Sequence, residues 1–457
     1  MSVRMRKMPT VEYVKSRFEY DGLRFGGEKN SNFLDGAECK NCLCENGVLS
    51  TGAGLEDYVT YDGNTVSVSS IKRPLKEVKS FRVHRRGYEF GEKMLLMTTN
   101  SIVYVYDPDS DDVQRLTQFG TRTKTVFGMD ADNEVYAFFC GPVGVWSYDE
   151  NGTLNEMTEN ANCGIACWYA DRLFFVQQPY AISFTPPCEP LNVQAVTGES
   201  GKMEVPSEFG EIVGFGALKD FLYVFTAQGI LRMRVRDGVE NFALEEVGYD
   251  GGKIFYDSVI SGSGHILFLA SDGLYLFDGH KAEKVCSELE IRPMRENQEV
   301  SGVYTDGFFY MQYVDVSGEV KRVCLSSDGK TAYFAFAADA LSDGGGKGFC
   351  VQDNMVKMLS RNGDLPKNEK YYFRSKNLAF GSEKRKTLTK LTIYGEKSCK
   401  VSVTADGVEK VFSVVFENGV ASVPVRMVGR SFSLTFTLEK SGKIRRVAAD
   451  VVALKRK

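Results

Sequence analysis

The chain has 457 residues, a formal net charge of −4, 43% hydrophobic and 25% charged residues, which is typical of a globular protein with two or three domains. This charge excludes a global field that would draw the protein to nucleic acid or anionic lipid, although local patches remain possible. No apolar run approaches the ~18 residues that cross a bilayer.

The composition favours strands over helices. Aromatic residues and glycine are plentiful (31 Phe, 22 Tyr, 45 Gly) and proline is sparse at 12, so we expect an all-β protein. The basic start is not followed by an apolar stretch, which argues against a signal peptide. Eleven scattered cysteines fit reduced thiols in a protein made inside a cell.

Residues 1–55 alternate poorly between apolar and polar positions, and we interpret them as an irregular N-terminal arm. Within this arm, Cys39, Cys42 and Cys44 have the most metal-like spacing of the chain. Structural zinc needs four Cys or His ligands, and only Cys163 or Cys167 suggest themselves as a fourth. We therefore predict that these three cysteines are free thiols. The sequence alone does not decide whether they bind a metal.

Residues 56–370 repeat one figure, best seen at 265–279, where two apolar runs flank a Ser-Asp-Gly turn. Such runs predict a buried antiparallel hairpin. The second arms of the recurring hairpins begin near Tyr104, Val145, Ile182, Ile230, Leu274 and Val320. These intervals of roughly 40–50 residues are typical of β-propeller blades. We predict a propeller of six to eight blades, with a large sandwich or two stacked sheets as the alternative.

Residues 371–457 alternate more cleanly, in six short segments at 390–395, 399–407, 409–419, 421–427, 430–440 and 443–454. Period-2 patterning of this kind predicts a small C-terminal β-sandwich. Two polar stretches before it, 341–347 and 362–370, are read as looser connections, and the Gly-rich 344–348 as a flexible linker.

No motif of catalysis is apparent. The chain has three histidines, at 84, 265 and 280, and none lies in a pattern that marks nucleophilic catalysis. The densest basic run, residues 72–86, could touch phosphates or an acidic partner, or form a solvated strand face. We predict no catalytic, cofactor-binding or metal-binding residues, no cofactor and no enzyme activity.

With this organisation, the chain resembles the β-propeller tail proteins of tailed bacteriophages, of the nozzle, tail-tubular-B or tail-hub type. In the arm, the resemblance is carried by Asn41, Gly47, Leu49 and Gly52. Towards the end, it is carried by Arg374, Ser375, Lys376, Phe380, Gly381, Tyr394, Gly395, Ala405, Asp406 and Gly407.

The resemblance implies a structural protein of the virion tail or neck, assembled in the host cytoplasm. Such proteins form homo-oligomeric rings, usually sixfold, beneath a portal and adaptor, and genomic DNA runs along the ring axis without sequence-specific binding. No membrane is involved. Two alternatives stay open: a cellular protein-interaction propeller, and a propeller that binds or hydrolyses glycans.

Overall fold

A computed structural model describes residues 11–456 except 26–31, 61–62, 85–89, 109, 159–163, 194–198, 236–241, 287–288, 290, 296–297 and 345. The described residues form strands, turns and one short 3-10 helix, Ser207–Phe209. None of their helices is long and apolar enough to span a bilayer. The expected all-β class is confirmed.

The chain divides into two units. One contains residues 55–329 and 337–363, and the other contains residues 1–54, 330–336 and 364–457. We call them the propeller unit and the sandwich unit. The propeller segment is thus inserted into the sequence of the sandwich unit.

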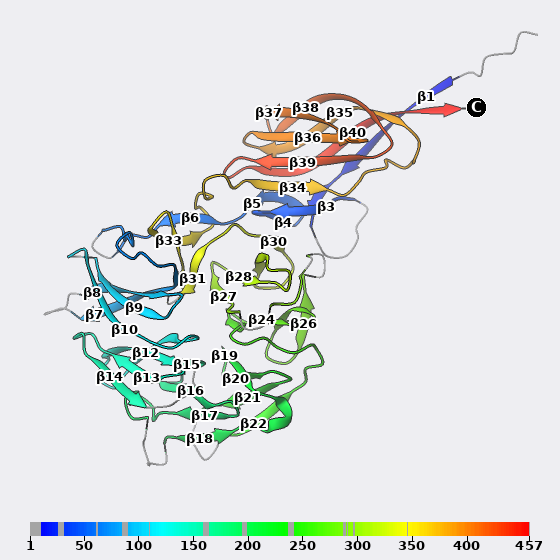
Figure 1. Ribbon diagram of the computed structural model, residues 1–457. Coiled ribbons are helices and arrows are strands. Elements are labelled where there is room, and N and C mark those ends of the chain that lie inside the picture. The colour runs from blue at the N-terminus through cyan, green and yellow to red at the C-terminus, as the bar shows by residue number, and fades with distance from the viewer. Residues whose placement is uncertain are drawn as a thin grey trace, which may run out of the picture. The chain divides into compact units, whose positions relative to one another are not determined.

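The described residues of the propeller unit form seven antiparallel blades, of which six are four-stranded sheets and one is a three-stranded section of a larger sheet (Figure 1). The first three are Leu75–His84 (β7), Phe90–Thr98 (β8), Ile102–Asp107 (β9) and Asp112–Gln118 (β10); Lys124–Met129 (β11), Val135–Gly141 (β12), Gly144–Tyr148 (β13) and Leu154–Thr158 (β14); and Ala166–Tyr169 (β15), Arg172–Gln178 (β16), Ala181–Phe184 (β17) and Gly201–Glu204 (β18).

The other four sheets follow in chain order. They are Ile212–Leu218 (β19), Phe221–Thr226 (β20), Ile230–Arg234 (β21) and Leu244–Val247 (β22); Ile260–Ser261 (β23), Ile266–Ala270 (β24), Gly273–Phe277 (β25) and Ala282–Val285 (β26); Ser301–Thr305 (β27), Phe308–Val314 (β28) and Val320–Ser326 (β29); and Asp339–Asp343 (β31), Gly348–Gln352 (β32), Met355–Ser360 (β33) and Gly54–Asp57 (β6).

The hairpin at 265–279 shows why these segments form blades. β24 and β25 pair in register from Ile266 opposite Phe277 to Ala270 opposite Gly273, and all ten residues are buried. Gly273 has φ = 150°, a value that is easily reached only without a Cβ. Because both faces of this strand pair carry apolar side chains, both faces must be buried against other elements. The two neighbouring blades bury them.

The core lies between adjacent blades. One cluster joins Phe225 of β20 to Phe268 and Phe277 of the next blade, with Phe225 and Phe268 ring centroids 5.2 Å apart. Each fully buried Phe contributes about 1.5–3 kcal/mol relative to an exposed one. Inter-blade packing therefore holds the propeller unit together.

The circle of blades is closed by a strand that is distant in the sequence. β6 pairs with β33, so the last blade combines three strands from residues 339–360 with one from residues 54–57. The stretch 341–347, interpreted above as a loose connection, contains the end of β31 and its turn into β32. The Gly-rich linker prediction was wrong for its described residues, because this turn sits within a blade.

The sandwich unit contains two sheets. One has the order β38-β35-β40-β5-β4, with β1 also on β40, and the other has β30-β3-β34-β39-β36-β37, with β2 on β3. Their bounds are Val11–Tyr20 (β1), Gly22–Arg24 (β2), Phe33–Lys40 (β3), Cys42–Glu45 (β4), Val48–Thr51 (β5), Ala332–Phe334 (β30), Tyr371–Ser375 (β34), Lys386–Glu396 (β35), Cys399–Ala405 (β36), Val408–Val414 (β37), Val420–Gly429 (β38), Phe432–Leu438 (β39) and Lys443–Arg456 (β40).

The six strands expected after residue 371 form, and alternate positions of β38 and β39 are buried. The irregular arm expected for residues 1–55 was wrong for the part that the structure describes. β1 pairs along its whole length with β40, and β3 pairs with β34. These segments gain their strand partners from the distant C-terminal part of the chain, which short-range patterning does not reveal.

Candidate functional site

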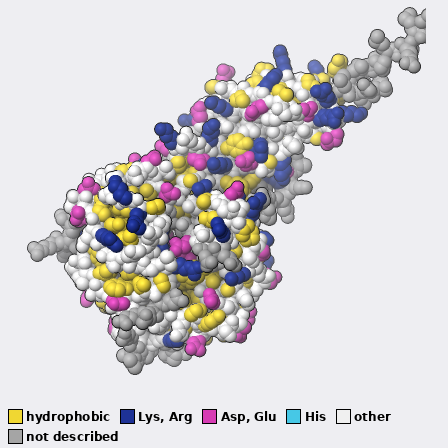
Figure 2. All heavy atoms as spheres, viewed as in Figure 1, with side chains coloured by type: hydrophobic (Ala, Val, Ile, Leu, Met, Phe, Trp, Pro, Cys, Tyr) yellow, Lys and Arg dark blue, Asp and Glu magenta, His cyan; other side chains and the backbone are white. Residues whose placement is uncertain are grey.

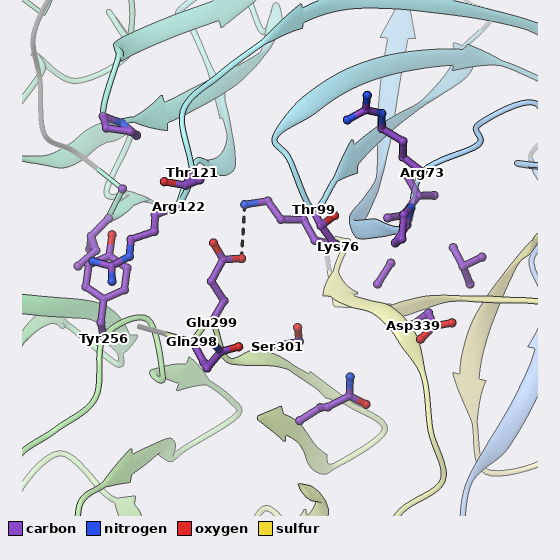
Figure 3. Close-up of a pocket in the computed structure, with 18 of the residues that line it drawn as sticks. Arg73, Lys76, Thr99, Thr121, Arg122, Tyr256, Gln298, Glu299, Ser301 and Asp339 are labelled. Atoms are coloured by element: carbon purple, nitrogen blue, oxygen red, sulfur yellow. Dashed lines mark hydrogen bonds and ion pairs between the residues drawn. The ribbon is translucent and has the colours of Figure 1, made fainter. Parts of the chain in front are cut away.

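One cavity lies at the propeller axis, where the chain enters the first strand of each blade. Its volume is about 1160 Å³. Residues at or just before the first strands of all seven blades line it (Figure 3), among them Lys76, Arg122, Ile165, Glu211, Tyr256, Ser301 and Asp339. The repeat itself builds this site, since every blade contributes the same end of its first strand.

Cationic groups reach into the cavity from two blades. The Lys76 ammonium donates to the Thr123 carbonyl oxygen at 3.2 Å and pairs with a Glu299 carboxylate oxygen at 3.5 Å. The Arg122 guanidinium lies over the Tyr256 ring, 4.8 Å from its centroid, in a cation–π contact. Gly164 permits this arrangement, because a Cβ there would lie 2.2 Å from the Tyr256 hydroxyl.

Deeper along the axis, a space of about 290 Å³ is lined by charged side chains of several first strands. Lys79 pairs with Glu77 at 3.3 Å and donates to the Thr125 carbonyl oxygen at 2.9 Å, while the Thr125 hydroxyl donates to Glu77 at 2.7 Å. The Lys79 and Glu77 side chains are only 13% and 15% exposed. The network ties β7 to β11.

A further ion pair joins Lys124 of β11 to Asp257, with Nζ and Oδ1 2.5 Å apart. Burial opposes the charge of Lys124, but the Asp257 carboxylate outweighs this effect and raises the lysine pKa above its ordinary value. Each axial cation described here thus has an acidic, carbonyl or aromatic partner. The arrangement stabilises the inner strands and supplies binding groups at the cavity rim.

Two lysines of the basic run 72–86 differ from the solvated strand face considered above, whereas Lys72 and Arg73 are exposed. Lys76 and Lys79 lie on β7, the first strand of its blade, and line the axial space. The side chains of residues 82–86 lie outside the described part of the chain. Position on a first strand was the signal that could have placed these lysines.

The three cysteines of the metal-like spacing lie close together. Cys39 and Cys42 are buried and Cys44 is half-buried, and the Cys39 thiol donates to the Cys42 carbonyl oxygen at 3.1 Å. Burial raises the pKa of Cys39 well above its usual range. Among the described residues, no three His, Cys, Asp or Glu side chains are arranged to hold a metal ion. Cys167 belongs to the propeller unit, and Cys163 lies outside the described residues.

All residues that carry the bacteriophage resemblance belong to the sandwich unit, and the two segments meet there. Glu38 of β3 stands opposite Arg374 of β34, with an ion pair of 3.0 Å between them. The buried Ser375 hydroxyl accepts the Leu434 N–H at 2.9 Å. Two sequence segments more than 300 residues apart thus form one paired structure.

Asn41 follows β3 directly and links the arm to the segment before β34. Its φ is 56°, its side-chain amide donates to the Lys370 carbonyl oxygen at 3.0 Å and to a Glu369 carboxylate oxygen at 3.3 Å, and its own carbonyl oxygen accepts the Gly52 N–H at 2.7 Å. A Cβ on Gly52 would lie 2.8 Å from that oxygen. Asn41 and Gly52 are therefore required by local geometry.

Comparisons with known proteins add fold-level likeness only. No protein-family model and no curated protein matches the chain. Solved structures similar to it include a streptogramin B lyase (11% identity, TM-score 0.43, covering 68% of this chain and 98% of that one) and the WD40 repeats of RRP9 (8%, 0.40, 66% and 99%). The WD40 propeller domain of Doa1 is also similar (11%, 0.38, 65% and 96%).

Proposed function

We propose that this protein is a structural component of a bacteriophage tail or neck, a ring-forming propeller of the nozzle or hub type. In this role, copies assemble in the host cytoplasm into a ring, by proposal a hexamer, beneath the portal and adaptor. The observation that carries the proposal is the pairing of β3, which ends directly before Asn41, with β34, which contains Arg374 and Ser375.

The axial cavity bears on where DNA would run. Its volume of about 1160 Å³ is close to the range of small-molecule sites, so duplex DNA does not pass through the propeller itself. The DNA path would be the axis of the ring of copies. On the face in Figure 2, Lys and Arg side chains are interspersed with Asp and Glu. With a net charge of −4, such a surface suits a channel that must not grip phosphates.

Location in virions tests this proposal. An antibody raised against residues 371–457 is used for gold labelling of particles from the source culture. Label at the neck or tail of phage particles is the expected result. Particles without label, together with protein confined to cell extract, would refute the structural role. Purified tails probed by mass spectrometry for the same chain provide a control against a masked epitope.

We propose no catalytic role. A second candidate, glycan binding, is favoured by one observation: the axial cavity combines the Tyr256 ring with amide and carboxylate groups of Gln298, Gln312 and Asp339. Aromatic faces with convergent polar groups suit ligands of this kind. The test is binding of host-surface glycans to the wild type and to Tyr256→Ala. Binding that survives this substitution unchanged would exclude the cavity as the glycan site.

A further inference from the structure

The sandwich unit has one sheet edge that is poorly protected. β37 ends the sheet order β39-β36-β37, and its second side has no strand partner among the described residues. Three valines in or beside this strand are highly exposed: Val408 (61%), Val411 (63%) and Val415 (71%). An exposed apolar edge strand is a template for pairing with another chain.

The charged residues of β37 do not shield this edge. The Lys410 ammonium lies 3.4 Å from the carbonyl oxygens of both Val425 and Arg426, to which it donates. Glu409 accepts a hydrogen bond from the Ser402 hydroxyl of the neighbouring strand β36. Both charged side chains thus form hydrogen bonds within the sandwich unit. The three valines are therefore the side chains that this edge exposes to solvent.

The edge of the other sheet provides an internal comparison. β38 also ends its sheet, but it carries the exposed Pro424 and Arg426 and an irregularity in its register with β35, opposite Leu388 and Lys390. Proline, charge and bulges are the features that prevent pairing at an edge. β38 has all three of them. β37 contains no proline, and its pairing with β36 is regular over all seven residues.

We propose that β37 is a contact surface for a second copy of this chain, which adds its own β37 antiparallel across a twofold axis at Val411. In an antiparallel pair, directly opposed residues point their side chains to the same face of the sheet. A strand that pairs with a second copy of itself must therefore have a residue, and not a peptide bond, on the twofold axis. Val411 is the midpoint of Val408–Val414, and only this centre pairs all seven residues.

Charge favours the same register. Centring on Val411 places Glu409 opposite Ser413, Lys410 opposite Phe412 and Val408 opposite Val414. Centring one or two residues earlier would place Lys410 opposite Lys410 or Glu409 opposite Glu409, which is destabilising. The contact therefore combines full overlap of the strand with the absence of opposed like charges.

This inference goes beyond the proposed function. An isologous contact closes after two copies, whereas a ring requires head-to-tail contacts. The β37 contact therefore joins free protein in pairs and does not build the ring. Its failure would leave the virion role untouched.

Substituted cysteines test the geometry directly. In Val411→Cys, two copies would place their cysteines opposite each other, with Cα atoms about 4.5–5.5 Å apart, within the range of a disulfide. With oxidised glutathione as the oxidant, the full-length variant should form a covalent dimer, seen on non-reducing gels. The matched control is Val428→Cys, on β38, where Val428 is 54% exposed. Wild type controls for the native thiols.

Solution measurements give the second test. Sedimentation velocity up to about 100 μM should show a monomer–dimer equilibrium for wild type. Val411→Lys places like charges on the twofold axis and should weaken dimerisation about tenfold or more. Unchanged hydrogen exchange of β36 and β39 peptides, followed by mass spectrometry, together with unchanged far-UV circular dichroism, shows that the sandwich unit of each variant is folded. Cross-linking of Val411→Cys no faster than the Val428→Cys control, or a dimer insensitive to Val411→Lys, would overturn the proposal. A purely monomeric wild type would do the same.

Discussion

Substitution of Asn41 should destabilise the sandwich unit. Comparison of Asn41→Gly with Asn41→Ala separates the cost of backbone strain from the cost of lost hydrogen bonds. Asn41→Gly keeps access to φ = 56° but removes the donors to Lys370 and Glu369. Net contributions of such bonds are about 0.5–1.5 kcal/mol each. The Asn41 Oδ1 atom, which is buried without a partner among the described residues, offsets part of this. We expect a loss of about 1 kcal/mol.

Asn41→Ala loses the same bonds and must also hold a left-handed backbone, which costs about 1–2 kcal/mol more for a residue with a Cβ. The expected total is about 2–3 kcal/mol. Since 1.4 kcal/mol is a factor of ten, amides of β3 and β34 that exchange through opening of the unit should exchange roughly 30-fold to 140-fold faster in Asn41→Ala.

The two units can be observed separately. Both tryptophans of the chain, Trp146 and Trp168, belong to the propeller unit. Urea unfolding followed by tryptophan fluorescence therefore reports the propeller, and hydrogen exchange followed by mass spectrometry reports peptides of β3 and β34. Equal effects of Asn41→Gly and Asn41→Ala would refute the assignment of backbone strain. A large shift of the tryptophan transition would show that the two units do not unfold independently.

Three further results are expected. Asp257→Asn should cost the propeller about 1 kcal/mol at pH 8, discounted because the Lys124 side chain is 35% exposed. Because the Lys124 pKa is raised in the folded state, this difference from wild type should shrink as pH rises through that pKa, and tryptophan-monitored unfolding at pH 8 and 11 checks the sign. Gly52→Ala should destabilise the sandwich unit by more than Asn41→Gly, as judged by hydrogen exchange, since its Cβ would lie 2.8 Å from a backbone oxygen; an effect below 0.5 kcal/mol would contradict the packing. In native protein at pH 8, iodoacetamide should fail to label the thiols whose pKa burial raises to about 12, and mass spectrometry would detect labelling at Cys167, Cys350 or Cys399.

Much of the propeller was predictable because its signal is local. The positions at Tyr104, Val145, Ile182, Ile230, Leu274 and Val320 all lie on the third strand of a blade. Each hairpin consists of an apolar run, a tight turn and a second apolar run within about a dozen residues. This short pattern is sufficient to predict a pair of buried strands. The seven observed blades lie within the predicted range of six to eight.

The elements that were missed depend on distant partners. β6 spans four residues, Gly54–Asp57, too few to show a period, and its partner β33 is about 300 residues away. β3 is interrupted by Asp35 and Gly36, so it reads as irregular until β34 covers it. The axial site was missed for a related reason. A lysine on a strand suggests solvent, and only the ring of first strands places Lys76 and Lys79 at an axis.

The pairing of β1 with β40 has a consequence for synthesis. The residues of one ion pair between them, Arg17 and Asp450, are 433 positions apart. At roughly 5–20 residues per second, the first strand waits about 20–90 s for its partner to be made. During that time, the whole propeller can emerge and fold. β1 must stay unpaired without aggregating, and its sequence, VEYVKSRFEY, contains two acidic and two basic residues, which oppose aggregation of an unpaired strand.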